Sequence, residues 1–134
     1  SKSKTGALIV IVRNLELAEQ INTGEKLNAR ISSALLRSLF FKNSPLHDGA
    51  VIIKGNRIAA AGCILPLTQK EVDKNLGLRH RAAIGITENT DAITIIISEE
   101  RGSISFAKNG EIKRRISKEG LTTFLEENII STAN

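Results

Sequence analysis

The sequence predicts an α/β fold in which a central mixed β-sheet is flanked by helices. Two short runs, 6–12 (GALIVIV) and 92–98 (AITIIIS), are apolar on both faces and rich in β-branched residues, as strands in the middle of a sheet are. Segments with helical periodicity lie between the predicted strands. Interleaved strands and helices are typical of helices layered around a mixed sheet.

The length and composition fit one folded unit, and we expect residues 1–134 to form a single domain. Hydrophobic residues make up 41% and charged residues 25%, which is ordinary for a globular protein and unlike a disordered chain. No apolar run reaches the roughly 18 residues of a membrane-spanning helix, and no signal-peptide pattern begins the sequence, so we expect a soluble polypeptide. The one cysteine, Cys63, excludes an internal disulfide, and its small neighbours predict a buried side chain rather than a catalytic thiol.

The charge balance favours a polyanionic partner. Nineteen Lys and Arg against fourteen Asp and Glu give a formal net charge of +5. Nucleic acid and nucleoside triphosphate both fit this charge. Single-strand binders, however, usually stack bases on aromatic side chains, and this chain has four Phe and no Trp or Tyr. We therefore expect no nucleic-acid partner.

The first half of the chain after 6–12 predicts an irregular stretch, a helix and a hairpin. Residues 13–26 are polar and mixed, with one short element around a turn at 22–24. An amphipathic helix is predicted over 27–40, because apolar residues recur every four positions, at Leu27, Ile31, Leu35 and Leu39. Pro45 lies beyond its end. Segments 49–53 and 57–63 then predict two strands joined by a tight turn.

The second half predicts a helix, two strands and a final helix. The helix is expected over 79–87, before the buried strand at 92–98, and an alternating strand is expected at 103–108, after a turn at 100–102. Asn109-Gly110 predicts a tight turn. Ser117 is a candidate N-cap for a helix with an apolar face of Leu121, Phe124, Leu125 and Ile129. The basic run 113–115 has no aromatic neighbours, so we interpret it as a solvent-exposed face.

The polar run 44–50 (SPLHDGA) is the first candidate site. His47 and Asp48 could share a divalent cation or place a carboxylate beside a hydroxyl group, and Gly49 would let a ligand approach the backbone. Asp-Gly is also a common turn, so an ordinary turn is the alternative for this segment taken alone.

The second candidate, 76–83 (LGLRHRAA), places three potential cations at a predicted helix start. Unpaired N–H groups and the helix dipole favour anions there, and guanidinium groups add bidentate contacts to phosphate. This pattern predicts a phosphate site, with a solvated basic turn as the alternative. A third cluster, Ser98-Glu99-Glu100, could offer a hydroxyl and a carboxylate to a ligand, although alone it is better explained as a turn.

Taken together, these segments resemble the diadenylate cyclase domain. TGALIV, SPLHDGAV, AAAGC-I-LPL, RHRAA and IISEERGSIS occur in its order and approximate spacing over nearly the whole chain. Its Asp-Gly-Ala and Arg-His-Arg motifs stand at 48–50 and 79–81, and two separated motifs in order are far more specific than one. The resemblance is closest to the membrane-anchored class. It implies the soluble, cytoplasmic part of a bacterial protein that meets the membrane only through preceding helices, which are absent here.

The resemblance implies that two ATP molecules are condensed into cyclic di-AMP with release of two pyrophosphates, in an active site between two facing copies of the domain. Asp48 is implied to bind the metal and to assist deprotonation of the ribose 3′-hydroxyl, with His47 as a second metal ligand. The catalytic residues implied are Asp48, Arg79, His80 and Arg81. The ATP-binding residues implied are Gly49, Ala50, Leu65, Leu78, Arg79, Arg81, Ser98 and Glu99.

Two positions, Ile64 and Leu78, depart from the family pattern. Ile64 stands where an aromatic residue is frequent, which removes an adenine-stacking surface. Leu78 stands where a Thr is common, which removes a hydroxyl group.

His47 favours Mn²⁺ or Co²⁺ over Mg²⁺, because imidazole is a poor magnesium ligand. The alternative function is a catalytically silent module that binds a nucleotide or cyclic dinucleotide. Asp48 argues against it, because a pure binder needs no carboxylate beside the reacting hydroxyl.

Overall fold

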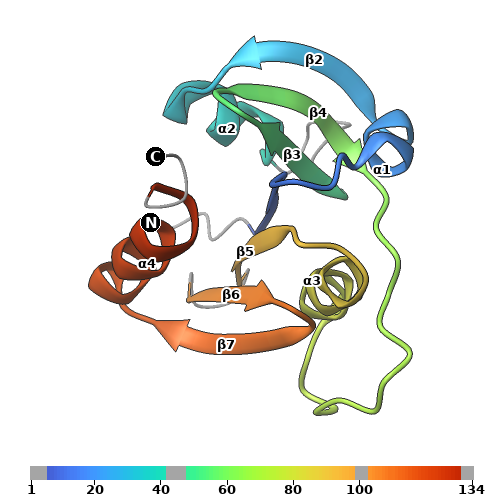
Figure 1. The fold of residues 1–134 in the computed structure, drawn as a ribbon, viewed down its shortest axis with the longest axis vertical. Helices are drawn as coiled ribbons and strands as arrows, with labels where there is room; N and C mark the ends of the chain where they lie inside the picture. The colour runs from blue at the N-terminus through green and yellow to red at the C-terminus, as the bar shows by residue number, and fades with distance from the viewer. Residues whose placement is uncertain (1–5, 42–47, 99–102, 131–134) are drawn as a thin grey trace.

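A mixed sheet of seven strands forms the middle of the computed structural model, which describes residues 6–41, 48–98 and 103–130 (Figure 1). The strand order is β2-β4-β3-β1-β5-β6-β7. Strands β1 and β3 are parallel and the other pairs are antiparallel, which confirms the predicted mixed sheet. The bounds are β1 Ala7–Ile11, β2 Glu25–Arg30, β3 Ala50–Lys54, β4 Arg57–Cys63, β5 Ile93–Ile97, β6 Ile104–Lys108 and β7 Glu111–Ile116.

The central strand β1 is apolar on both faces because helices cover both faces of the sheet. Helices α1 (Ala18–Asn22) and α3 (Leu78–Glu88) lie on one face, and α2 (Ser33–Leu39) and α4 (Lys118–Leu125) lie on the other (Figure 1). Helix α4 continues into a π-helical turn, η1 (Glu126–Ile130). No helix in the described ranges has the length and apolar character needed to cross a membrane.

The two faces of the sheet carry separate hydrophobic clusters. On the α3 side, Leu8 and Val10 of β1 pack in one cluster with Ala83 and Ile86 of α3. On the α2 side, the alternate residue Ala7 packs with Leu39, Phe40, Val51 and Ile58. The Phe106 and Phe124 rings stack with centroids 3.6 Å apart and join α4 to β6. The strand alternation therefore divides the β1 residues between two cores.

The prediction of a single helix over 27–40 is wrong. Residues 25–30 form the edge strand β2, and α2 begins only at Ser33. Ser32 is the N-cap, because its hydroxyl accepts a hydrogen bond from the Leu35 N–H at 3.0 Å. Asn28 has a φ of 49°, which an α-helix does not allow, at a register shift against β4. The four-residue apolar spacing spans a bulged strand followed by a short helix.

The other elements agree with the sequence, except that β7 was missed. The helix predicted at 79–87 is α3, and the hairpin is β3–β4. The Ser117 N-cap is confirmed, because its hydroxyl accepts from the Gly120 N–H at 2.9 Å. The Asn109-Gly110 turn is also confirmed, with positive φ at both residues. The predicted turn at 100–102 and the Pro45 loop lie outside the described residues, as does the side chain of Ile129.

Close packing at Gly85 fixes α3 against the segment that precedes it. A Cβ atom at Gly85 would lie 1.9 Å from the carbonyl oxygen of Pro66. The same segment is bonded to the helix again, because the Thr68 N–H donates to the carbonyl oxygen of Arg81 at 3.1 Å. Helix α3 is therefore held against this segment by two backbone contacts, and the closer one requires glycine at position 85.

Gly85→Ala is expected to lower the free energy of unfolding by at least about 2 kcal/mol, because backbone atoms must move to admit the methyl group. Chemical denaturation measured by circular dichroism tests this. Gly77→Ala is the matched control, because a Cβ atom there meets nothing within 4 Å. It should cost less than about 1 kcal/mol. Equal losses in the two variants would contradict the packing argument.

Candidate functional site

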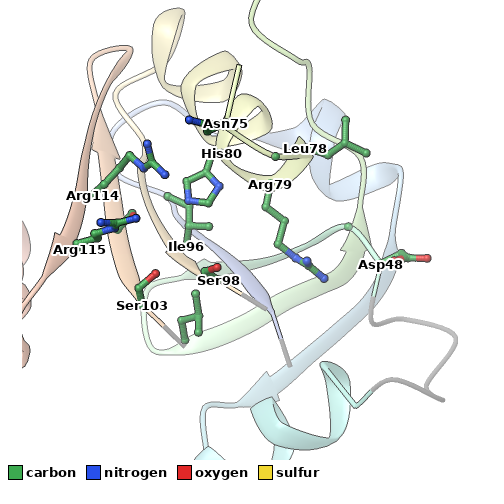
Figure 2. Close-up of a pocket in the computed structure, with 14 residues that line it drawn as sticks. Asp48, Asn75, Leu78, Arg79, His80, Ile96, Ser98, Ser103, Arg114 and Arg115 are labelled. Carbon is green, nitrogen blue, oxygen red and sulfur yellow. The ribbon is translucent and has the colours of Figure 1, made fainter. Parts of the chain in front are cut away.

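A cavity of about 1050 Å³ lies where β5 ends and α3 begins (Figure 2). This volume is large enough to hold a nucleotide. Ile96 and Ser98 line it from the end of β5, and Ser103 lines it just before β6. Arg79 and His80 line it from the first turn of α3. Four segments that are separate in the sequence contribute to its wall: the start of β3, the α3 region, the β5–β6 pair and β7.

Six of the residues implied by the resemblance line this one cavity: Asp48, Gly49, Leu78, Arg79, His80 and Ser98. Ala50 and Leu65 are not among the lining residues, and both are buried, with Leu65 packed in the α3-side cluster. Arg81 is also outside the lining, and its Nε–H donates to the carbonyl oxygen of Leu76 at 3.2 Å. His47 and Glu99 lie outside the described residues.

Local packing and backbone conformation require a glycine at position 49, next to Asp48. Gly49 has a φ of +91°, and a Cβ atom there would lie 2.7 Å from the Cys63 carbonyl oxygen. Other residues are strained in this backbone conformation. The tight entry into β3 therefore places the exposed Asp48 at the rim of the cavity. The segment bends sharply, as the turn interpretation expects, and it also lines the cavity. A role for Asp48 beside a cation or a hydroxyl group stays a prediction.

The N-terminus of α3 faces the cavity without a side-chain cap. Its N-cap is Gly77, which makes no capping hydrogen bond and lines the cavity together with Leu78 and Arg79. The first-turn N–H groups of an uncapped helix attract anions, and so does the helix dipole. Arg79 adds a guanidinium group at the same place. This geometry favours the phosphate-site interpretation over a solvated basic turn.

The cavity has an excess of positive charge. Within the described ranges its lining holds three arginines, Arg79, Arg114 and Arg115, against one carboxylate, Asp48. Burial lowers the pKa of the half-buried His80, and the charges of Arg114 and Arg79 lower this pKa further. His80 is therefore neutral at pH 7, so it can exchange hydrogen bonds with a ligand without adding charge.

Arg114 and Arg115 are the site residues that sequence analysis missed, because their run was interpreted as a solvated face. They belong to β7 and line the cavity, as Figure 2 shows on the side away from Asp48. The alternation of Ile112, Arg114 and Ile116 is typical of a strand, but it does not predict that Arg114 and Arg115 line one cavity.

Cys63 takes no part in this chemistry. Its side chain is completely buried on β4, and burial raises the pKa of the thiol to about 11. A thiol with so high a pKa is almost wholly protonated at neutral pH and is a weak nucleophile. The prediction of a buried, structural cysteine is confirmed.

The fold and the site define an α/β domain with a cationic, nucleotide-sized cavity. Residues 1–112 match the family model described as "DisA bacterial checkpoint controller nucleotide-binding", the DAC family. The chain therefore belongs to the diadenylate cyclase (DAC) domain family, as the motifs indicated.

Relatives in several bacteria support this membership. The chain is 52% identical to "Cyclic di-AMP synthase CdaA" of Bacillus subtilis over 94% of its length, and 51% identical to "Diadenylate cyclase" of Listeria monocytogenes over 98%. These matches cover 46% and 48% of the two relatives, so the chain spans about half of their length.

Solved structures agree with the fold. A crystal structure of DacA from Staphylococcus aureus, a double mutant, superimposes with a TM-score of 0.91 at 47% identity, over 95% of this chain and 85% of that one. A "hypothetical membrane spanning protein" from Bacillus cereus gives a TM-score of 0.81 at 51% identity, over 85% and 56% of the two chains.

Arg114→Gln is expected to raise the pKa of His80, because it removes a nearby positive charge. The measurement is an NMR titration in a His47→Ala background, where His80 is the sole histidine of the chain. Lys113→Gln, on the same strand but outside the cavity lining, is the control and should leave this pKa nearly unchanged. An unchanged pKa in Arg114→Gln would show that the Arg114 charge does not reach the imidazole.

The sign of the pH effect on stability follows from the same shift. The His80 pKa is lower in the folded protein than in the unfolded chain, where a histidine titrates at about 6.5. Just below that pH, His80 therefore binds a proton more readily in the unfolded chain. The His80 contribution to stability is therefore complete above that pH and is lost as the pH falls from there through the lower pKa of the folded state.

Proposed function

We propose that this chain is the catalytic domain of a diadenylate cyclase, which joins two ATP molecules into cyclic di-AMP and releases two pyrophosphates. The observation that carries the proposal is that Asp48 and Arg79, from two motifs far apart in the sequence, line one cationic cavity together with the uncapped start of α3. The names of the similar Bacillus and Listeria proteins support the same activity.

The reaction is two nucleotidyl transfers. In each, the ribose 3′-oxygen of one ATP attacks the α-phosphorus of the other and loses its proton, while the bond from that phosphorus to the α,β-bridging oxygen breaks. The bridging oxygen leaves with pyrophosphate, and the second transfer closes the ring. Enzymes accelerate such transfers chiefly by positioning the reactants and stabilising charge, without a protein nucleophile. A cavity of arginines, helix N–H groups and one carboxylate provides these functions.

Each side chain has a proposed role in that reaction. Asp48 assists removal of the 3′-hydroxyl proton, Arg79 holds the α-phosphate with the N–H groups of α3, and neutral His80 donates a hydrogen bond to phosphate. The Arg81 Nε–H already donates a hydrogen bond to the Leu76 carbonyl oxygen. The terminal guanidinium nitrogens of Arg81 are therefore the groups proposed to contact phosphate. The other proposed ATP-binding residues are Gly49, Ala50, Leu65, Leu78, Ser98 and Glu99.

A divalent cation fits at Asp48. No group of three or more His, Cys, Asp or Glu side chains suitable for a metal exists within the described ranges. Cations that serve phosphoryl transfer commonly need only one or two carboxylates, because substrate phosphates complete their coordination. Asp48 and His47 would hold the ion, which supplies positive charge to phosphate oxygens and makes a bound hydroxyl more acidic. Manganese or cobalt is the proposed ion, for the reason given above.

A face-to-face homodimer is the proposed working state, because each cavity contributes one Asp48 and the product needs two ribose hydroxyls and two α-phosphates. The domain is proposed to lie in the cytoplasm as part of a membrane-anchored bacterial protein. A similar solved structure is described as that of a "hypothetical membrane spanning protein".

Asp48→Asn is expected to reduce cyclic di-AMP formation at least about 100-fold while ATP binding persists, because the carboxylate acts on the reacting hydroxyl. The assay incubates the purified chain with ATP and Mn²⁺ and resolves products by chromatography and mass spectrometry. Glu19→Gln, an exposed carboxylate on α1, is the control and should retain activity. If wild type binds ATP but makes no product even when dimerised through a fused coiled coil, the silent binding module is correct.

Mn²⁺ or Co²⁺ is expected to support faster turnover than Mg²⁺, and His47→Ala should reduce the ratio of manganese to magnesium activity, because imidazole favours the softer ions. Initial rates at saturating metal test both expectations. Highest activity with Mg²⁺ and an unchanged ratio in His47→Ala would contradict the proposed role of His47.

A further inference from the structure

Strand β7 carries a bulge at the wall of the cavity. Ile104 pairs with Ile116, and Phe106 pairs with Lys113, so one residue of β6, Ser105, faces two residues of β7. Those two residues are Arg114 and Arg115. In a regular strand consecutive side chains point to opposite faces, and a bulge interrupts this alternation. Both arginines consequently line the same cavity (Figure 2).

The backbone at the bulge is unfavourable for the residue that occupies it. Arg115 has a φ of 55°, in the left-handed region that a residue with a Cβ atom adopts at a cost. Glycine or asparagine would adopt it more easily. A long basic side chain stands there instead, and the residue lines the cavity.

The two arginines differ in how they are held. The Arg114 Nη1 lies 3.6 Å from the Asp73 Oδ2, in the segment that leads into α3. Asp73 in turn accepts a hydrogen bond from the Asn75 N–H at 2.9 Å. Arg115 forms no ion pair or side-chain hydrogen bond with the described part of the chain. One guanidinium group is thus oriented by the protein, and the other is available to a ligand.

We propose that Arg114 and Arg115 form the subsite for the β- and γ-phosphates of ATP, and hence for the leaving pyrophosphate. The inference rests on the proposed function. Asp48, the residue proposed to act on the 3′-hydroxyl, lies at one side of the cavity. Arg79 lies between, and the two β7 arginines lie at the other side (Figure 2). An α-phosphate held at the start of α3 leaves the rest of the triphosphate to reach that far wall.

The subsite serves both the reaction and product release. Negative charge accumulates on pyrophosphate as the bond from the α-phosphorus to the bridging oxygen breaks, and two guanidinium groups stabilise that charge through bidentate contacts. Cyclic di-AMP has no β- or γ-phosphate. Once pyrophosphate leaves, the product makes no contact with the two arginines and is held less tightly than ATP.

The test compares ligands that contain or lack the terminal phosphates, by isothermal titration calorimetry in the presence of Mn²⁺. The probes are α,β-methylene ATP, which resists turnover, AMP and inorganic pyrophosphate. Each of Arg114→Gln and Arg115→Gln should weaken α,β-methylene ATP and pyrophosphate binding about 10-fold, since each removes a charged hydrogen-bond donor. AMP affinity should change less than about 2-fold. Lys113→Gln, outside the lining, should change none of the three.

Arg115→Asn separates binding from folding. Asparagine tolerates the left-handed backbone, so this variant should unfold at the same or a higher temperature than wild type and still lose triphosphate affinity. Equal losses for AMP and α,β-methylene ATP, or no loss for either, would overturn the subsite.

The binding and activity measurements together distinguish a wrong subsite from a wrong proposed activity. Selective loss of triphosphate binding in a protein that makes no cyclic di-AMP would support the subsite and reject the cyclase. Cyclic di-AMP formation by wild type, combined with undiminished triphosphate affinity in both arginine variants, would support the cyclase and reject the subsite.

Discussion

The packing of α3 against the sheet and against the segment before it is the constraint on which the site depends. Ala83 and Ile86 are buried against the face of the sheet, and Gly85 lets the backbone at Pro66 approach closely. These contacts fix the direction of the helix. The direction in turn determines where the uncapped first turn, with Arg79, presents its N–H groups.

The cavity then follows from which segments the sheet brings to that first turn. The parallel β1–β3 pair and the antiparallel β1–β5 pair place the start of β3 beside the end of β5, and both line the cavity together with the start of α3. The β6–β7 pair completes it with arginines. Asp48 and the basic residues come from different segments, so the opposing charges share a cavity, where a ligand with both hydroxyl and phosphate groups could bridge them.

The sequence predicted the features that depend on local pattern and failed where tertiary pairing decides. Buried strands, the hairpin, α3 and the Ser117 cap follow from apolar runs, turn residues and capping chemistry. The segment 25–30 was mistaken for helix because its apolar spacing fits both structures, and only pairing with β4 selects the strand. The motif residues of the site could be named from family resemblance. Arg114 and Arg115 could not, because a bulge depends on the register of two strands.

The bulge in β7 also protects the edge of the sheet against pairing with another chain. Strand β7 is the last strand in the order, so one of its sides has no partner strand among the described elements. An exposed strand of this kind is a template for pairing with another chain and for aggregation. Three consecutive basic residues and an irregular, left-handed backbone step make β7 a poor template. Replacing the run with a regular, uncharged strand would therefore endanger solubility as well as ligand binding.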